Sequence, residues 1–388
     1  MKRLHSLLLA LNKKERKVLI MAKGSKKAVD FENLKANLGK EFKPVQILDS
    51  DAKVVNEDLM ANFSNDQLVN FMKKLVWERA LHEQTMNFSR QGRLGFYAPT
   101  AGEEASEMGT VSAFKENDFL FPAYRDVPQL IQHGATVTEG YLWSRGHVKG
   151  NQFKARSLMP QIIIGAQMVE MAGAALGLKK NGEDAVAFAY TGDGGTSQGD
   201  TYEGMNFAGA FQAPAVFIIQ NNGFAISVPR KKQTAAVTLA QKAVAAGIPS
   251  VQVDGMDILA CYQVAKEARE FAAAGNGPVM IETLTYRFGA HSSAGDDPSR
   301  YRTKEEEQPW FDIDPLIRMR KYLTDKKLWT QEQEDAYVEE CKNSFKDAIK
   351  EADGVEPEKV SDMLKNTFEV PTPDIKKQIA EFEAKESK

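Results

Sequence analysis

The sequence contains few of the residues that build covalently cross-linked or zinc-bound scaffolds. Only two of its 388 residues are cysteines, Cys261 and Cys341, and they form no Cys-x-x-Cys motif. This spacing argues against both a disulfide framework and a cysteine-ligated zinc site. Such sparse cysteine use is typical of a reducing compartment, so we expect a cytoplasmic protein.

Long apolar runs and a dominant charge are also absent. No stretch reaches 18 uninterrupted apolar residues, so no membrane span is predicted. Lys and Arg number 50 against 53 Asp and Glu, a net charge of −3. This balance argues against nucleic acid or an anionic membrane as a partner. With 43% hydrophobic and 27% charged residues, the chain has the composition of an ordinary globular protein.

Residues 1–60 are polar, and we interpret them as an N-terminal extension or arm. Their apolar run at residues 7–11 is too short to span a bilayer, and basic residues follow where a secretory signal would have its cleavage site. A basic leader for the mitochondrial matrix is the alternative. The preferred interpretation is a solvated extension, with Met21 as a second candidate for the start of the protein.

Short β-favouring runs alternate with helical segments in the middle of the chain. The runs contain little polar alternation, which is typical of strands buried on both faces of a parallel sheet. They lie at residues 161–164, 185–190, 215–220, 251–253 and 278–286.

Helices are expected between and around these runs, at residues 64–90, 166–178 and 258–274, the last with Asp257 as its N-cap. The fold class is therefore α/β, with a doubly wound, mostly parallel sheet and flanking helices. We expect this domain at residues 61–311 and a charged, helical C-terminal region at 312–388.

Two polar loops follow neighbouring predicted strands, at residues 191–199 and 221–227. Ligands of such folds bind beyond the carboxyl ends of the strands, so both loops belong to one candidate site. Glycines allow the backbone to approach phosphate closely, but Asp193 would repel it unless a cation lay between them. Mg²⁺ prefers oxygen ligands. We expect these from Asp193, from the Asn222 side chain and from a backbone carbonyl, that of Phe224.

Two other interpretations compete with a metal–phosphate site. A nicotinamide-binding turn needs Gly-x-Gly-x-x-Gly, and here Gly192 and Gly194 are followed by Ser197 at the third glycine position. The second alternative is that both loops are only tight turns of a non-catalytic scaffold subunit.

The Gly-Asp-Gly and Asn-Asn loops together resemble the signature of thiamine-diphosphate enzymes. Residues 63–329 are similar to the alpha subunit of the decarboxylating component of 2-oxo acid dehydrogenase complexes, most closely to bacterial pyruvate enzymes. The similarity is carried in fixed order by residues 123–126, 164–167, 192–199, 221–227 and 253–257, and by His291 with 301–303. It implies a thiamine-diphosphate-binding fold, with thiamine diphosphate and Mg²⁺ as cofactors.

The resemblance assigns the diphosphate end of that cofactor to two groups of residues. Tyr124 and Arg125 would contact the diphosphate, and Arg is well suited to grip phosphate. Gly192, Gly194 and Gly195 would surround it with backbone.

The same resemblance assigns the reacting end. Ile162 would contact the cofactor, and Ile164 would keep it bent. His291 would act as the catalytic residue that positions substrate or acyl group. Phe96 and Tyr97 would line the substrate entrance.

One required group is absent, since activation of the cofactor needs a glutamate from a second α/β domain. Only one such domain fits in this chain. We therefore expect a beta subunit in an α2β2 heterotetramer. The enzyme would be an oxidoreductase that decarboxylates a small 2-oxo acid and passes the acyl group to a lipoyl disulfide on the acyltransferase core. Pyruvate is the expected substrate, with branched-chain 2-oxo acid and acetoin enzymes as alternatives.

Overall fold

The computed structural model describes residue 29 and residues 31–387. The chain divides into two units, Met1–Glu41 and Phe42–Lys388. Helix α3 (Phe31–Asn37) belongs to the first unit. The apolar run at 7–11, the leader interpretation and Met21 lie outside the described residues. None of the described helices combines the length and the hydropathy needed to cross a bilayer.

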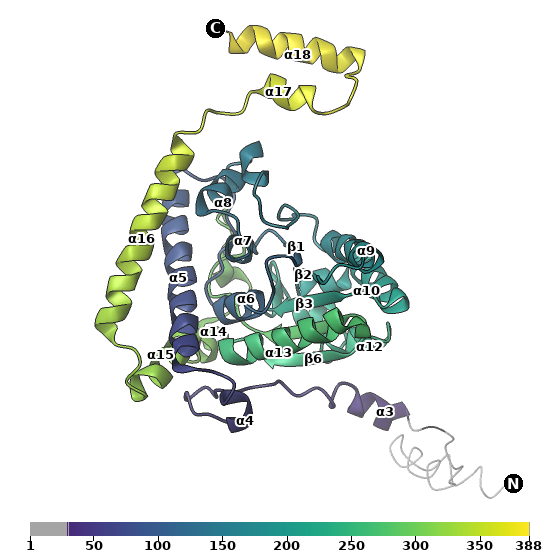
Figure 1. The fold of residues 1–388 in the computed structure, drawn as a ribbon, viewed down its shortest axis with the longest axis vertical. Helices are drawn as coiled ribbons and strands as arrows, with labels where there is room; N and C mark the ends of the chain where they lie inside the picture. The colour runs from purple at the N-terminus through teal and green to yellow at the C-terminus, as the bar shows by residue number, and fades with distance from the viewer. Residues whose placement is uncertain (1–28, 30, 388) are drawn as a thin grey trace, which may run out of the picture. The chain divides into compact units, whose positions relative to one another are not determined.

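A five-stranded sheet with the order β1-β2-β3-β7-β6 forms the centre of the second unit, and every pairing in it is parallel (Figure 1). Its strands are β1 (Phe119–Phe121), β2 (Ala187–Gly192), β3 (Ala215–Asn221), β6 (Ser250–Asp254) and β7 (Val279–Leu284). A separate antiparallel pair joins β4 (Phe224–Ala225) to β5 (Val228–Pro229). The predicted α/β fold with a parallel sheet is confirmed.

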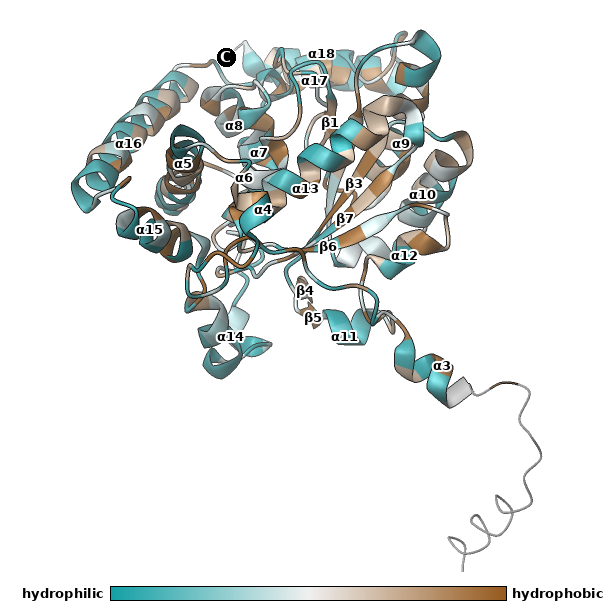
Figure 2. Ribbon diagram, turned by 60° about the horizontal axis from the view of Figure 1, so that its bottom comes forward, coloured by the Kyte–Doolittle hydropathy of each residue, from teal (hydrophilic) through white to brown (hydrophobic). Residues whose placement is uncertain are grey.

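Both faces of the sheet are covered by helices, and β3 is buried along its whole length (Figure 2). Val216 and Ile218 pack in one apolar cluster with α5 (Asn65–Arg90), α6 (Glu104–Val111) and α13 (Ile258–Phe271). Phe217 and Ile219 point to the other face, in a cluster with α9 (Ala166–Asn181) and α10 (Gly199–Phe211). The alternation places large aliphatic or aromatic side chains on both sides, which explains the continuous apolar run in the sequence.

The expected strand at residues 161–164 is wrong. Gln161 makes an isolated bridge with Ala123, and the chain then bends into the start of α9. Pro160 has no N–H to give to a ladder, and Gly165 has φ of 103°, so the segment cannot continue as a strand. Ile163 is left 69% exposed.

The C-terminal region is helical, as expected. Helix α16 runs against α5, where Phe345 and Ile349 join Leu81 and Phe88 in a third apolar cluster. Its helices are α15 (Pro315–Asp325), α16 (Gln331–Asp353), α17 (Val360–Lys365) and α18 (Pro373–Glu386), and α14 (Lys304–Phe311) precedes the region. The remaining short helices are α4 (Glu57–Met60), α7 (Val127–Gln132), α8 (Val137–Ser144), α11 (Arg230–Gln233) and α12 (Gln241–Val244). The domain boundaries that the sequence analysis placed after residues 60 and 311 remain predictions.

Asp257 caps α13, as its sequence position predicts, and it also binds a distant segment. One carboxylate oxygen accepts hydrogen bonds from Leu259 and Ala260 N–H at 3.1 and 3.4 Å. The other accepts from Ile47 and Leu48 N–H at 2.7 and 2.8 Å. Asp257 is 1% exposed, so all of these bonds are shielded from water.

Replacing Asp257 with Ala should therefore cost more than a helix cap. Loss of the cap costs about 1 kcal/mol, and each N–H left buried without an acceptor adds about 1–3 kcal/mol. We expect Asp257→Ala to lower the free energy of unfolding by about 3 kcal/mol or more in urea titrations. Thr330→Ala, which removes the exposed cap of α16, should cost only about 1 kcal/mol. Equal losses in the two variants would contradict the assignment.

Candidate active site

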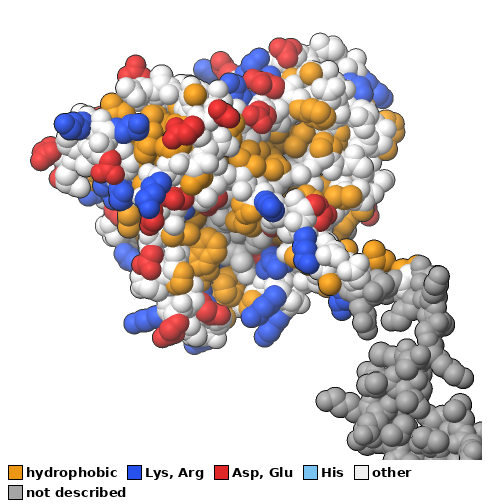
Figure 3. Space-filling view, turned by 90° about the horizontal axis from the view of Figure 1, so that it is seen from below, with side chains coloured by type: hydrophobic (Ala, Val, Ile, Leu, Met, Phe, Trp, Pro, Cys, Tyr) orange, Lys and Arg blue, Asp and Glu red, His pale blue; other side chains and the backbone are white. Residues whose placement is uncertain are grey.

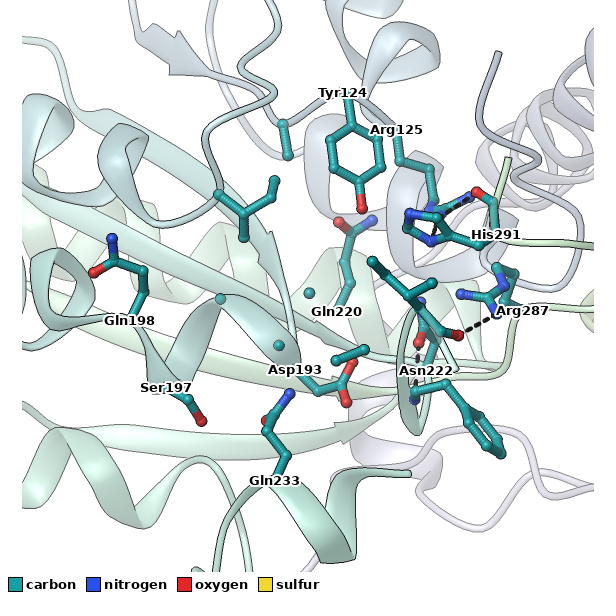
Figure 4. A pocket seen from close by; sticks show the side chains of 18 of the residues that line it. Tyr124, Arg125, Asp193, Ser197, Gln198, Gln220, Asn222, Gln233, Arg287 and His291 are labelled. Carbon is teal, nitrogen blue, oxygen red and sulfur yellow. Dashed lines mark hydrogen bonds between the residues drawn. The ribbon is translucent and has the colours of Figure 1, made fainter. Parts of the chain in front are cut away.

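A cavity of about 610 Å³ lies at the carboxyl ends of β1, β2, β3 and β7 (Figure 4). The parallel pairing aligns Gly192 with Gln220, so the loops after β2 and β3 emerge side by side. All but one of the residues singled out in the sequence line the cavity. They are Phe96, Tyr124, Arg125, Ile162, Ile164, Gly192, Asp193, Gly194, Gly195, Asn222, Phe224 and His291.

Asp193 is the acidic residue of the loop after β2. It is 1% exposed, and its Oδ2 atom has no hydrogen-bond donor among the described residues. Burial, and secondly the nearby charge of Glu103, raise the pKa of Asp193 to about 7. A carboxylate in such surroundings is stable as an anion only beside a positive charge.

The backbone around Asp193 is held from several sides. Thr196 donates its hydroxyl to the Asp193 carbonyl at 2.7 Å, and the Lys242 ammonium donates to the Thr196 carbonyl at 2.8 Å. Gly195 packs so tightly that a Cβ atom there would lie 2.0 Å from the Thr191 hydroxyl. The loop therefore requires glycine at this position, and contacts within the chain hold its backbone.

Asn222 follows β3 and is 5% exposed. Its Oδ1 atom accepts from the Phe224 N–H at 3.2 Å, and its Nδ2 atom donates to Glu103 at 3.0 Å. The preceding Asn221 donates to Glu282 of β7 at 2.7 Å. Neighbouring strands thus fix this second loop at the same edge of the sheet as Asp193.

Two buried arginines supply positive charge to the cavity. Arg125 is 7% exposed and donates to the backbone carbonyls of Pro99 and His291, the latter at 3.2 Å. Arg287 is 1% exposed, and one of its terminal nitrogens has no acceptor among the described residues. Because both guanidinium groups line the cavity, its electrostatics suit an anion with several oxygen atoms.

His291 lies beside these arginines. Burial, followed by the charges of Arg125 and Arg287, lowers its pKa to about 4, so its imidazole is neutral at neutral pH. Its Nδ1 atom is 3.4 Å from an Arg125 nitrogen, which can only donate, so the ring proton belongs on Nε2. The Tyr124 ring packs edge-on against the imidazole at 5.7 Å between centroids.

Tyr97 is the predicted site residue that does not line the cavity. It is 6% exposed, and its hydroxyl lies 3.3 Å from His82 Nδ1. Its backbone N–H donates to the Ser293 hydroxyl at 3.2 Å, which ties the segment to the His291 loop. Its neighbour Phe96 reaches the cavity instead, because this segment is irregular and places adjacent side chains on different sides.

Sequence reasoning missed Glu103, Arg287 and Lys242. Arg287 follows the end of β7, so the strand-end rule that found Asp193 could have found it as well. Glu103 and Lys242 approach the site from α6 and α12, away from any recognised loop motif, and nothing in their local sequence marks them.

Comparison with known proteins gives one family and a consistent set of relatives. The family described as "Dehydrogenase E1 component" matches residues 72–361. The pyruvate dehydrogenase E1 component subunit alpha of Staphylococcus epidermidis is 55% identical over 350 residues, covering 90% of this chain and 95% of the relative. The protein of the same name from Staphylococcus aureus is 54% identical with the same coverage.

Behind the cavity wall, α5 and α6 bring two carboxyl groups together. Glu78 and Glu107 are fully buried, and none of their four carboxylate oxygens has a hydrogen-bond partner among the described residues. Burial raises the pKa of Glu78 to about 8 and that of Glu107 well above its usual value. Two carboxyl groups buried together without hydrogen-bond donors do not both ionise readily, so the folded protein carries a proton here near neutral pH.

This proton makes stability pH-dependent in a definite direction. Because folding raises these pKa values, the stabilisation is complete at low pH and is lost as the pH rises toward 8 and above. Glu107→Gln supplies an N–H donor permanently. We expect its unfolding free energy to fall less between pH 6 and 8.5 than that of the wild type, by up to about 1.4 kcal/mol per pH unit. Glu83→Gln, at an exposed position on α5, the helix that carries Glu78, should follow the wild type. Identical profiles for all three proteins would refute the buried proton.

Proposed function

The chain belongs to the dehydrogenase E1 component family, and from that premise we propose that it is the alpha subunit of a pyruvate dehydrogenase E1 component. With a beta subunit it would decarboxylate pyruvate oxidatively and transfer the acetyl group to a lipoyl group. The observation that carries the proposal is the buried, partly unpaired Asp193 carboxylate, which lines one cavity together with Asn222 and two arginines. The name shared by relatives at 54–55% identity supports pyruvate as substrate.

Enzymes of this family depend on thiamine diphosphate, and the cavity has the groups that its diphosphate–metal end needs. Asp193, the Asn222 side-chain oxygen and the Phe224 carbonyl would hold Mg²⁺. The unpaired Oδ2 atom of Asp193 fits this role, because a cation would satisfy it. Tyr124, Arg125 and the backbone of Gly192, Gly194 and Gly195 would bind the diphosphate oxygens (Figure 4). Arg287 adds a second guanidinium to this end.

The bound cofactor would supply the electron sink for decarboxylation, and the chain would supply orientation and proton control. Ile162 and Ile164 line the cavity. Ile162 would contact the cofactor, and Ile164 would keep it bent. His291 would present its Nε2 proton to the substrate or the acyl group as a neutral donor, and its low pKa keeps it from acting as a permanent cation. Phe96 would limit the size of the substrate.

A partner chain is supported by the rim of the cavity. Ile162 and Ile226 line it yet are 64% and 56% exposed, and nearby Ile163 and Val228 are 69% and 44% exposed. Figure 3 shows apolar patches exposed among the charged side chains on the face seen from below. The carboxylate of Glu103 is already engaged by Arg125 and Asn222. We therefore propose that the activating glutamate comes from a beta subunit in an α2β2 assembly. This assembly would deliver the acetyl group to the lipoyl acyltransferase core.

The bacterial source of the relatives favours a cytoplasmic location for this complex over a mitochondrial one. The proposal requires neither nucleic acid nor a membrane as a partner.

Replacing Asp193 with Ala tests the metal site directly. Without the Asp193 carboxylate, the metal ion that binds the diphosphate would have one protein ligand fewer. We expect Mg²⁺-dependent binding of thiamine diphosphate to the co-expressed complex to weaken by more than about 100-fold in calorimetric titrations. Asp184→Ala, at the opposite end of the same strand, should bind as the wild type does. Unchanged affinity for thiamine diphosphate in Asp193→Ala would contradict the assignment of Asp193 as a metal ligand.

Substrate choice requires a separate measurement on the complex with its beta subunit. Pyruvate, 2-oxoisovalerate and acetoin should be assayed side by side with thiamine diphosphate and Mg²⁺ at saturation. We expect kcat/KM to be highest for pyruvate by about tenfold or more, which corresponds to about 1.4 kcal/mol of discrimination. A preference for 2-oxoisovalerate or acetoin would instead identify the chain as the alpha subunit of the branched-chain 2-oxo acid enzyme or of the acetoin enzyme.

A further inference from the structure

Glu103 is a buried acid at the floor of the cavity, in contact with two residues of different predicted roles. It is 1% exposed. Its Oε1 atom accepts from Asn222 Nδ2 at 3.0 Å and lies 3.6 Å from Arg125 Nε. One oxygen atom thus joins a predicted metal ligand to a predicted diphosphate-binding residue.

The position of Glu103 is not explained by the helix that it precedes. It is the N-cap of α6, but its side chain makes no capping hydrogen bond. Instead, the carboxylate turns into the cavity. The preceding Gly102 has φ of +95°, and a Cβ atom there would lie 2.1 Å from the Tyr286 carbonyl. Glycine is therefore required for the backbone to pass this close to the end of β7 and carry Glu103 to the floor.

The contact with Asn222 determines which end of its amide can serve a cation. An amide carries an acceptor oxygen and a donor nitrogen that exchange places when the group turns by 180°. With Nδ2 bonded to the Glu103 carboxylate, Oδ1 is held on the opposite side of the group, where it accepts from the Phe224 N–H at 3.2 Å. Without an acceptor at Glu103, the amide would lose the bond that excludes the turned orientation, in which nitrogen would face the metal.

The contact with Arg125 has an electrostatic effect. Arg125 is buried, and its other polar contacts are with the Pro99 and His291 carbonyls and with the His291 ring, none of which carries a negative charge. Glu103 is the carboxylate in an ion pair with it. The carboxylate thus balances the charge of the buried guanidinium, while the terminal nitrogens of Arg125 remain directed toward His291 and Pro99.

We propose that Glu103 is a positioning residue that presents the oxygen of Asn222 to Mg²⁺ and holds Arg125 at the diphosphate, so that metal and diphosphate are bound as one unit. The inference rests on the proposed function and concerns binding of the cofactor, not the chemistry on the substrate. Partners that orient a metal ligand in this way typically change metal affinity by about 10–100-fold when removed.

Two substitutions separate the two effects in the co-expressed complex. Glu103→Gln keeps an acceptor for Asn222 and removes the charge, whereas Glu103→Leu removes both. Titration calorimetry with thiamine diphosphate, repeated over a series of Mg²⁺ concentrations, measures binding without turnover. We expect binding to weaken and the Mg²⁺ requirement to rise by about 3–10-fold in Glu103→Gln and by about 10–100-fold in Glu103→Leu. With both cofactors at saturation, KM for pyruvate should stay within about twofold of the wild type.

Asp118→Asn is the matched control. Asp118 is also a fully buried carboxylate paired with an arginine, Arg269, at 2.9 Å, but it precedes β1 at the opposite edge of the sheet. This variant should lose stability without changing the Mg²⁺ requirement. If Glu103→Leu does not assemble, the graded loss in Glu103→Gln carries the test alone.

The outcomes separate this inference from the proposed function. Wild-type binding with wild-type Mg²⁺ dependence in both Glu103 variants would overturn the role of Glu103 and leave the function intact. The same shift in Asp118→Asn would also overturn it, because the effect would then be general loss of packing. Failure of the wild-type complex to bind thiamine diphosphate would remove both proposals.

Discussion

A buried carboxylate with one unpaired oxygen is the constraint on which the site depends. Asp193 is held at 1% exposure by a loop that its own glycines and Thr196 make rigid. Removing such a group from water is costly, and no described residue donates to its Oδ2 atom. A cation would resolve this arrangement, and the surrounding groups fit that purpose, because Asn222 offers an amide oxygen and two arginines supply positive charge that suits an anion.

The parallel sheet makes this arrangement possible. Because β2 and β3 are neighbours in register, Asp193 and Asn222 leave the sheet at the same edge. The adjacent ends of β1 and β7 bring Arg125 and Arg287 to that edge, so four strands contribute to one cavity. Side chains behind the loops, such as Lys242 and Glu282, bind backbone and amide groups and keep the loops in place. The catalytic geometry is therefore fixed by strand register more than by any single contact.

The strands and the polar loops just after them could be predicted from the sequence, because the local residue pattern and the chemistry of the side chains both indicate the same structure. The apolar runs that became β2, β3, β6 and β7 were recognisable, and the polar loops after β2 and β3 followed from them. Residues 161–164 have the composition of a strand, but Pro160 and Gly165 prevent pairing. The placement of Phe96 on the cavity and of Tyr97 behind it depends on an irregular segment in which alternation gives no guide. Glu103 could not be found, since its role arises only when α6 packs beneath a loop more than a hundred residues away in sequence.

The central claim is that Asp193 and Asn222 hold a divalent metal at the diphosphate of a bound cofactor. The most direct measurement is a crystal structure of the complex with its beta subunit, grown with thiamine diphosphate and Mn²⁺ in place of Mg²⁺ and recorded at a wavelength where Mn²⁺ scatters anomalously. The account predicts one anomalous peak within coordination distance, about 2 Å, of a carboxylate oxygen of Asp193 and of Oδ1 of Asn222, with diphosphate oxygens completing the shell. A cofactor bound with its diphosphate away from these residues, or a metal bound without them, would contradict it.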